Sequence, residues 1–205
     1  FWIFYHRSRC TKGYAPKQPI AFSHKLHAGD LKLDCKYCHS TVEESKQASI
    51  PALNTCMNCH KGVQLTDKYN GEISPEIKKI YAALDYNPEA KPGEEYGKNP
   101  RPIRWVRIHN LPDHAYFNHS QHVKVGKQTC QTCHGPIQEM EVVQQYSTLQ
   151  MGWCINCHRE RKIDVENNPY YEKLHEKIKA EKNNKNSEYS KYFTKDGKIN
   201  ITPAQ

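Results

Sequence analysis

Apolar side chains are scarce in this sequence. They make up 37% of its 205 residues, and the mean hydropathy is −0.92. A compact domain of this length normally buries more apolar surface, because burial must offset the conformational entropy lost on folding. The composition therefore predicts either a loosely folded chain or a core that is partly supplied by a non-protein group.

Long hydrophobic runs are also lacking. The chain opens with FWIFY and no initiator Met, and these five apolar residues fall well short of the roughly 20 that span a bilayer. Aromatic side chains favour the membrane interface. We therefore expect residues 1–19 to be the end of a membrane anchor, whose start precedes this sequence, followed by a linker.

Signatures of catalysis and of nucleic-acid binding are missing too. No paired carboxylates, nucleophile–base pair or glycine-rich phosphate loop stands out, and the net charge of +8 comes from lysines spread along the chain. Without a recognition motif this charge does not predict a nucleic-acid partner. We expect a subunit that works through a bound cofactor rather than a catalyst by itself.

Cysteine is the informative residue. Eight of the nine cysteines form C-x-x-C pairs, each followed at once by histidine, and Cys10 stands alone. The cysteine pairs are Cys35 and Cys38, Cys56 and Cys59, Cys130 and Cys133, and Cys154 and Cys157. The histidines that follow them are His39, His60, His134 and His158.

Three kinds of site use C-x-x-C pairs. The gaps of 17 residues after Cys38 and 20 after Cys133 fit a four-cysteine zinc site, but such a site has no use for a histidine after every second cysteine. A redox dithiol needs one reactive pair, not four. C-x-x-C-H is the attachment signature of c-type haem. Two thioether bonds hold the porphyrin, and the next residue lies under the iron as its proximal ligand.

The sequence also contains an internal duplication. The stretch FSHKLH precedes the first motif as FNHSQH precedes the third, with an offset of 95 residues. The paired histidines in these stretches are separated by three positions, which places both on one side of a helical turn. We therefore expect His24, His27, His119 and His122 to be distal haem ligands.

The ligand supply bears on function. His109 is a fifth candidate for a distal ligand, and Met140 or Met151 could bind an iron through sulfur, whereas we expect Met151, Trp153 and Phe117 to pack on porphyrin. With a distal ligand for every iron, no haem needs an open site for a substrate. The sequence therefore predicts electron transfer by low-spin haems, matured on the periplasmic side. It leaves open which distal histidine serves which iron.

The expected fold is mainly α-helical with much irregular structure, almost no sheet and a haem-dominated core. Two duplicated di-haem modules are predicted at residues 20–63 and 105–162. Between them, residues 64–104 form a linker with a helix that has Ser74 as its N-cap and ends near Leu84. After them, residues 163–205 form a charged C-terminal arm with an amphipathic stretch around 170–180.

These motifs resemble those of known families. The F-x-H-x-x-H preface before C-x-x-C-H resembles class III multihaem cytochromes such as cytochromes c3 and c7. A longer match, which includes IPALNTCMNCHKG, WVRIHNLPDHAYFNHSQHV and MGWCINCHR within residues 16–162, resembles ActA, the multihaem cytochrome c subunit family of alternative complex III.

The second resemblance implies a role in a membrane quinol oxidoreductase. In such a complex an iron–sulfur subunit and a quinol-oxidising membrane subunit deliver electrons to this chain, which passes them to a monohaem cytochrome c or a terminal oxidase. It implies a position on the periplasmic face of the bacterial inner membrane. That family is usually pentahaem, so a fifth haem would have to bind outside this sequence or be absent.

Three alternatives stay open at this point. The chain could be a free periplasmic electron carrier like cytochrome c3. It could be a NapC-type quinol dehydrogenase that oxidises quinol itself. It could also be a haem enzyme such as a nitrite or hydroxylamine reductase, which requires a five-coordinate haem.

Overall fold

The structure is a computed structural model, and it describes residues 12–111, 114–161, 167–181 and 188. Within these ranges the chain forms short helices joined by long irregular segments, and its sheet content is one isolated bridge between Tyr86 and Tyr96. The expectation of a mainly helical, irregular fold is confirmed. The helical elements are η1 (Lys25–Asp30), α1 (Cys35–Cys38), α2 (Leu53–His60), η2 (Thr66–Tyr69), α3 (Pro75–Leu84), η3 (Gln121–Val125), α4 (Cys130–His134), η4 (Ile137–Glu139), α5 (Met151–Glu160) and α6 (Pro169–Ala180).

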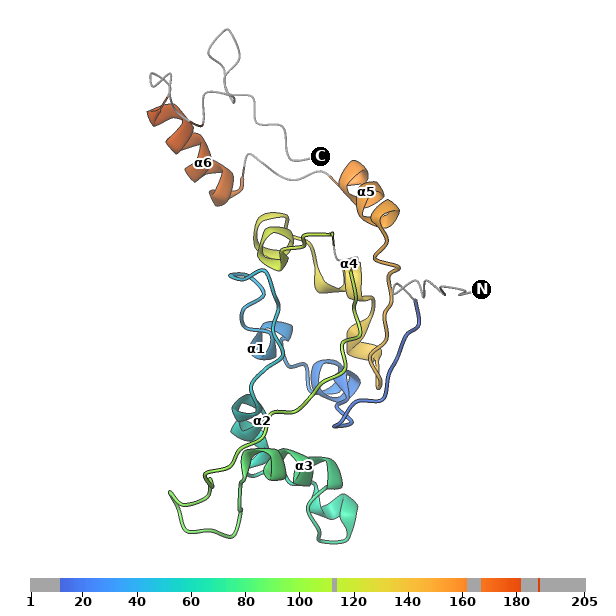
Figure 1. The fold of residues 1–205 in the computed structure, drawn as a ribbon, viewed down its shortest axis with the longest axis vertical. Helices are drawn as coiled ribbons and strands as arrows, with labels where there is room; N and C mark the ends of the chain where they lie inside the picture. Colours follow the sequence, from blue (N-terminus) through green and yellow to red (C-terminus); the bar gives the residue numbers. More distant parts are fainter. Residues whose placement is uncertain (1–11, 112–113, 162–166, 182–187, 189–205) are drawn as a thin grey trace, which may run out of the picture.

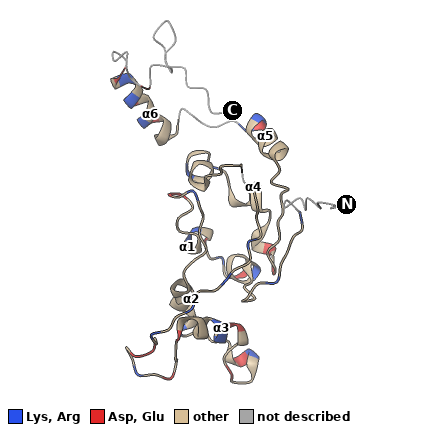
Figure 2. Cartoon of the chain, viewed as in Figure 1, with Lys and Arg blue, Asp and Glu red and all other residues tan. Residues whose placement is uncertain are grey.

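The helix expected in the linker is α3. It begins after Ser74 with proline at its first position, and Asp85 ends it in the left-handed conformation. The Ser74 side chain makes no capping hydrogen bond, so the proline and the apolar face carry the helix start. Charged residues of both signs occur along α3 and in the loop that follows it (Figure 2).

A hydrophobic cluster joins α3 to α2. Its buried members are Ile20, Met57, Ile77, Ile80 and Tyr81, and partly buried apolar side chains pack around them. Only eleven apolar side chains are buried in the whole described part of the chain. Apolar side chains therefore pack on one another mainly at one end of the molecule, around the second C-x-x-C-H motif.

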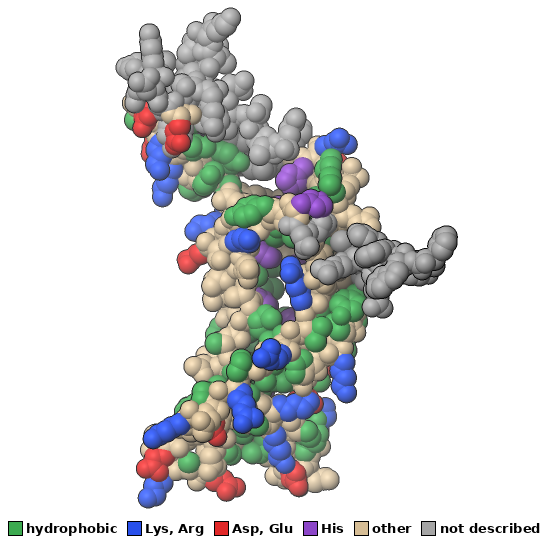
Figure 3. Space-filling model, in the orientation of Figure 1, with side chains coloured by type: hydrophobic (Ala, Val, Ile, Leu, Met, Phe, Trp, Pro, Cys, Tyr) green, Lys and Arg blue, Asp and Glu red, His purple; other side chains and the backbone are tan. Residues whose placement is uncertain are grey.

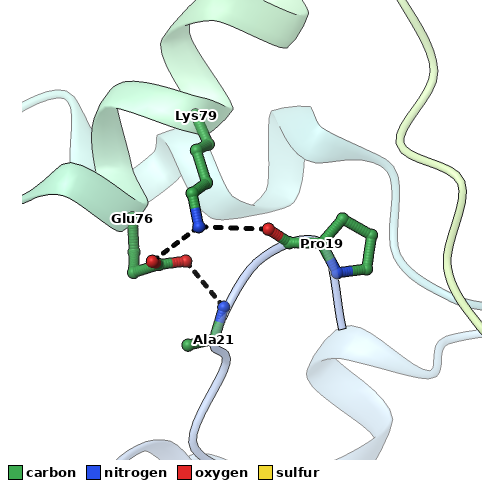
Figure 4. A network of polar contacts seen from close by, with 4 residues as sticks. All are labelled: Pro19, Ala21, Glu76 and Lys79. Carbon is green, nitrogen blue, oxygen red and sulfur yellow. Dashed lines mark hydrogen bonds and ion pairs between the residues drawn. The ribbon is translucent and has the colours of Figure 1, made fainter. Parts of the chain in front are cut away.

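A polar network fastens the N-terminal segment to α3 (Figure 4). Glu76 accepts a hydrogen bond from the Ala21 amide at 2.7 Å, and Lys79 donates to Glu76 at 2.6 Å and to the Pro19 carbonyl at 3.2 Å. This fixes the start of the first duplicated stretch, which follows immediately. The amide of Gln18 also pairs in both directions with the backbone of Val106, at 2.9 Å each.

The internal duplication extends to the backbone. Each F-x-H-x-x-H stretch continues into a π-helical turn, η1 in the first copy and η3 in the second. Both turns end with an i to i−5 hydrogen bond, Leu31 to Leu26 and Gly126 to Gln121. π-Helical turns are rare and are frequently found at functional sites. Two positions after each turn, Lys32 and Lys127 adopt the same left-handed conformation, with φ of 56° and 51°.

The two copies also hold each other. The Lys25 amide donates to the Met140 carbonyl at 3.0 Å, and the Ser120 amide donates to the Ser45 carbonyl at 3.2 Å. Lys25 and Ser120 are equivalent positions of the repeat, and so are Ser45 and Met140. In each copy, the turn that carries the paired histidines is therefore hydrogen-bonded to the other copy, at the segment that follows the first C-x-x-C-H motif of that copy.

The amphipathic stretch expected near the C-terminus is α6, whose N-cap Asn168 accepts from the Tyr170 amide and donates to the Val125 carbonyl at 2.7 Å. The proposed anchor remnant and Cys10 fall at residues 1–11, outside the described residues, as does most of the arm after residue 181. Among the helices that the structure describes, none combines the length and apolarity needed to cross a membrane.

Candidate haem-binding site

Four short helices carry the cysteine pairs. Helices α1, α2, α4 and α5 each contain one C-x-x-C sequence. In a helical turn the i and i+3 side chains lie on the same face, so both sulfurs of a pair point to one side. None of these eight cysteines forms a disulfide, and none is buried. This is the arrangement that two thioether bonds to one porphyrin require.

The histidines after these pairs are held by backbone carbonyls. His39 Nδ1 lies 2.6 Å from the Ser49 carbonyl oxygen, and His60 Nδ1 lies 2.8 Å from that of Val63. A hydrogen bond at Nδ1 places the proton there and leaves Nε2 as the free lone pair. The carbonyl of His60 itself accepts a hydrogen bond from the Tyr81 hydroxyl.

Two of the expected distal ligands have the same arrangement. His27 Nδ1 and His122 Nδ1 each lie 2.8 Å from the carbonyl oxygen four residues earlier, on Ser23 and Asn118. Their Nε2 atoms are thus also free. Because the partner is a carbonyl, the side chain at that position can be serine in one copy and asparagine in the other.

A phenylalanine supports each distal pair. Phe22 stacks on His27 at 4.3 Å between ring centroids and meets His24 edge-on at 4.9 Å. Phe117 stacks on His122 at 4.3 Å and meets His119 edge-on at 4.9 Å. Phe117 was expected to pack on porphyrin, which stays a prediction, and the structure adds its contacts with the two histidine rings. The F-x-H-x-x-H repeat was the signal that could have revealed this role.

The structure brings two proximal–distal pairs of histidines together, with their ring planes inclined at 62° and 56°. The rings of His27 and His60 have centroids 6.1 Å apart, and those of His122 and His158 are 6.0 Å apart. Two imidazoles that bind one metal from opposite sides, each at about 2 Å, have centroids roughly 6 Å apart. The spacing therefore fits one iron between each pair, and histidine side chains are visible in the middle and upper part of the face in Figure 3.

The other two expected distal ligands, His24 and His119, differ in their hydrogen bonding. His119 Nδ1 is 2.9 Å from the Lys46 carbonyl oxygen. His24 Nδ1 is buried without a hydrogen-bond partner. Burial, with the nearby rings of His39 and His27, lowers the pKa of His24 to about 4. The neutral imidazole that results is the form that binds a metal.

His109 has a different environment. Its Nε2 lies 3.2 Å from Nδ1 of His134, and the two rings meet edge-on at 4.4 Å. Burial, followed by His109 and three further histidines, lowers the pKa of His134 to about 3. In this arrangement His109 is the hydrogen-bond partner of a proximal ligand, and an axial role requires its ring to turn over.

The three methionines fall in different places. Met57 is buried in the α2–α3 cluster, in agreement with the argument that it cannot turn back onto the iron of its own motif. Met140 is buried and its carbonyl accepts from Lys25, whereas Met151 is 58% exposed.

These observations test the fit of haem to the residues present. Cysteine pairs without disulfides, oriented imidazoles and histidine rings at the right separation all fit haem, which would supply one reversible electron per iron. The zinc alternative needs converging thiols, and within the described ranges no three His, Cys, Asp or Glu side chains form a metal-holding group.

Comparisons with known proteins agree. Residues 20–74 match the family of cytochrome c7 and related cytochrome c, and residues 99–195 match the class III cytochrome C family. The chain is also similar to the multiheme cytochrome c subunit of menaquinone reductase from Nitratidesulfovibrio vulgaris. The two are 29% identical over 171 residues, which cover 74% of this chain and 72% of the relative. The two family matches together cover most of the chain, and its cofactor is covalently bound c-type haem, in several copies.

Proposed function

We propose that this chain is the multihaem cytochrome c subunit of a quinone-linked membrane oxidoreductase of the alternative complex III type. The observation that carries the proposal is the pairing of His27 with His60 and of His122 with His158. These imidazoles would hold an iron from both sides and leave no free position on it for a substrate. A site of this kind would exchange electrons and would do no bond chemistry of its own.

Residues of the chain itself are expected to set the range of midpoint potentials at which the haems exchange electrons. Carbonyls at Ser49, Val63, Ser23 and Asn118 hold the imidazole protons and make the rings better donors to iron. Strong imidazole donors on both sides stabilise the oxidised metal relative to a Met-ligated one. The relay is therefore expected to work at low potential, close to quinone pools.

The proposed setting has three parts. The modules are residues 20–63 and 105–162, with residues 64–104 between them. The partners are an iron–sulfur subunit and a quinone-reactive membrane subunit, with a monohaem cytochrome c or terminal oxidase as acceptor. The site of action is the periplasmic face of the inner membrane, where residues 1–19 continue an anchor and residues 163–205 form an arm.

A second direction of flow is favoured by one observation. The relative is named a menaquinone reductase subunit, so its complex delivers electrons to the quinone. The same relay would serve either direction, because transfer between similar bis-imidazole sites is reversible. The direction is set by the partner subunits and their potentials.

The proposal is tested by isolating the tagged full-length protein from native membranes. Co-purification of an iron–sulfur subunit and an integral membrane subunit is the expected result, with haem reduction on adding menaquinol. A soluble monomer without partners would favour the free carrier. Reduction by quinol of the chain expressed alone would favour the NapC-type alternative, and a high-spin haem signal would favour an enzyme.

A further inference from the structure

We infer that the four haem-binding motifs are stacked in the order second, first, third, fourth, so that the motifs ending in His60 and His158 occupy the two terminal positions. This inference rests on the proposed role as an electron relay and specifies its layout. The order differs from the order along the chain, which would place the second motif between the first and the third.

The first and second motifs touch directly. Asn58, inside the second C-x-x-C pair, donates to the hydroxyl of Tyr37, inside the first pair, at 3.0 Å. The rings of His27 and His60 have centroids 6.1 Å apart, and the Leu33 amide, two residues before Cys35, donates to the His27 carbonyl at 3.0 Å. The first motif and the turn that precedes it therefore both contact the second motif.

The third and fourth motifs are arranged in the same way. The rings of His122 and His158 have centroids 6.0 Å apart, and the Gln128 backbone amide, two residues before Cys130, donates to the His122 carbonyl at 2.9 Å. The turn that precedes the third motif thus contacts the fourth motif, just as the turn that precedes the first motif contacts the second.

The first and third motifs meet in the middle. The Cys130 thiol has the Cys35 thiol as a hydrogen-bond partner, and these two cysteines are equivalent positions of the repeat. The crossed backbone contacts of Lys25 with Met140 and of Ser120 with Ser45 flank this meeting point. In Figure 1 the helices follow the same order from the lower end upward: α2, α1, α4, α5.

The long connection makes this order feasible for the chain. The segment after α3 runs back alongside the first module before it reaches α4 (Figure 1). The pairing of Val106 with Gln18 fastens it there. Each inner motif therefore has a haem-binding neighbour on both sides and each terminal motif on one side, so exchange with partner proteins is expected at the ends.

The direct test locates the irons in crystals of the holo-protein by anomalous scattering at the iron edge. The expected result is that the iron at His39 has two near neighbours, those at His60 and His134. An iron at His60 lying between those at His39 and His134 would overturn the inference.

A second test works in solution and uses two matched variants. His27→Met and His122→Met replace a distal imidazole with a thioether, which raises the potential of one terminal site so that it is reduced first. The added electron lowers the potentials of its neighbours by an amount that falls with distance. Potentials are followed through haem methyl NMR signals during a stepwise reduction.

The two variants then discriminate between the orders. His122→Met is the control, because the fourth site has the third as its sole neighbour in either order. For His27→Met we expect the midpoint potential to change mainly at the His39 site. Comparable changes in potential at the His39 and His134 sites would support the order along the chain and refute the inference. Both tests use the purified chain, so their outcome is independent of whether it belongs to the proposed complex.

Discussion

Met57 offers a sharp test of how the polypeptide supports a haem motif. It lies between the two cysteines of the second motif and is 2% exposed, within the cluster of Ile20, Ile77, Ile80 and Tyr81. We predict that Met57→Ala lowers the free energy of unfolding of the holo-protein substantially, although Met57 is not one of the residues expected to bind haem. The reason is that this end of the molecule depends on protein packing.

The size of the effect follows from burial. Removing a fully buried methionine side chain forfeits about 2 kcal/mol of transfer free energy. The cavity left behind adds to this, and measured Met-to-Ala costs in cores are about 2–5 kcal/mol. A loss of about 3 kcal/mol lowers the melting temperature of a chain of this size by about 6 to 12 °C.

The assay is thermal unfolding by circular dichroism, with haem content matched by pyridine haemochrome. Met57→Leu is the control, because it keeps the volume and should cost under about 1.5 kcal/mol. Equal melting temperatures for the alanine and leucine variants would show that the cluster does not support the motif, and the reasoning would fail.

Three further predictions concern individual side chains. Phe22→Leu and Phe117→Leu each remove ring stacking of about 1 kcal/mol on a distal ligand. Because a less firmly held histidine is more easily displaced from iron, carbon monoxide binding should rise at one haem in each variant. Binding at the wild-type level would contradict this. His109→Leu removes the hydrogen-bond partner of the proximal ligand His134. One midpoint potential should rise while all haems stay low-spin, and His109→Gln should restore the wild-type potential. A high-spin haem in His109→Leu would show instead that His109 is an axial ligand. The Lys79 ammonium and then the Ala21 amide hold the pKa of Glu76 below its usual range. The network in Figure 4 therefore contributes stability that is fully present above about pH 4.3 and is lost as the pH falls through the lowered pKa. The NMR shift of the Ala21 amide should follow the protonation of Glu76, and the same titration curve in Glu76→Gln would refute this assignment.

Much of this organisation could be predicted from local patterns. The C-x-x-C-H spacing indicates the cofactor because its chemistry constrains five consecutive residues. The helices at Pro75–Leu84 and Pro169–Ala180 were recognisable because an apolar face follows a proline at the first turn. The duplication was visible because both copies keep their histidines at the same offset.

Other features depend on contacts that the linear sequence does not encode. The carbonyls that orient His39 and His60 belong to residues whose side chains play no part, so no residue type marks them. The π-helical turns have no propensity signal of their own. The stacking order of the motifs depends on how a long connection returns, and the contact between His109 and His134 joins residues 25 positions apart.

The crossed contact between the copies has a further consequence. Cys35 meets its own equivalent, Cys130, and the two backbone bonds beside it are reciprocal. A surface that meets its own copy in this way is an isologous interface, the kind that a two-fold symmetric homodimer forms. The two copies of the repeat therefore meet as two subunits of such a dimer would, although they belong to one polypeptide. In a true homodimer the two ends would be identical. Here the α3 cluster belongs to the first copy and α6 follows the second, so the two ends present different surfaces.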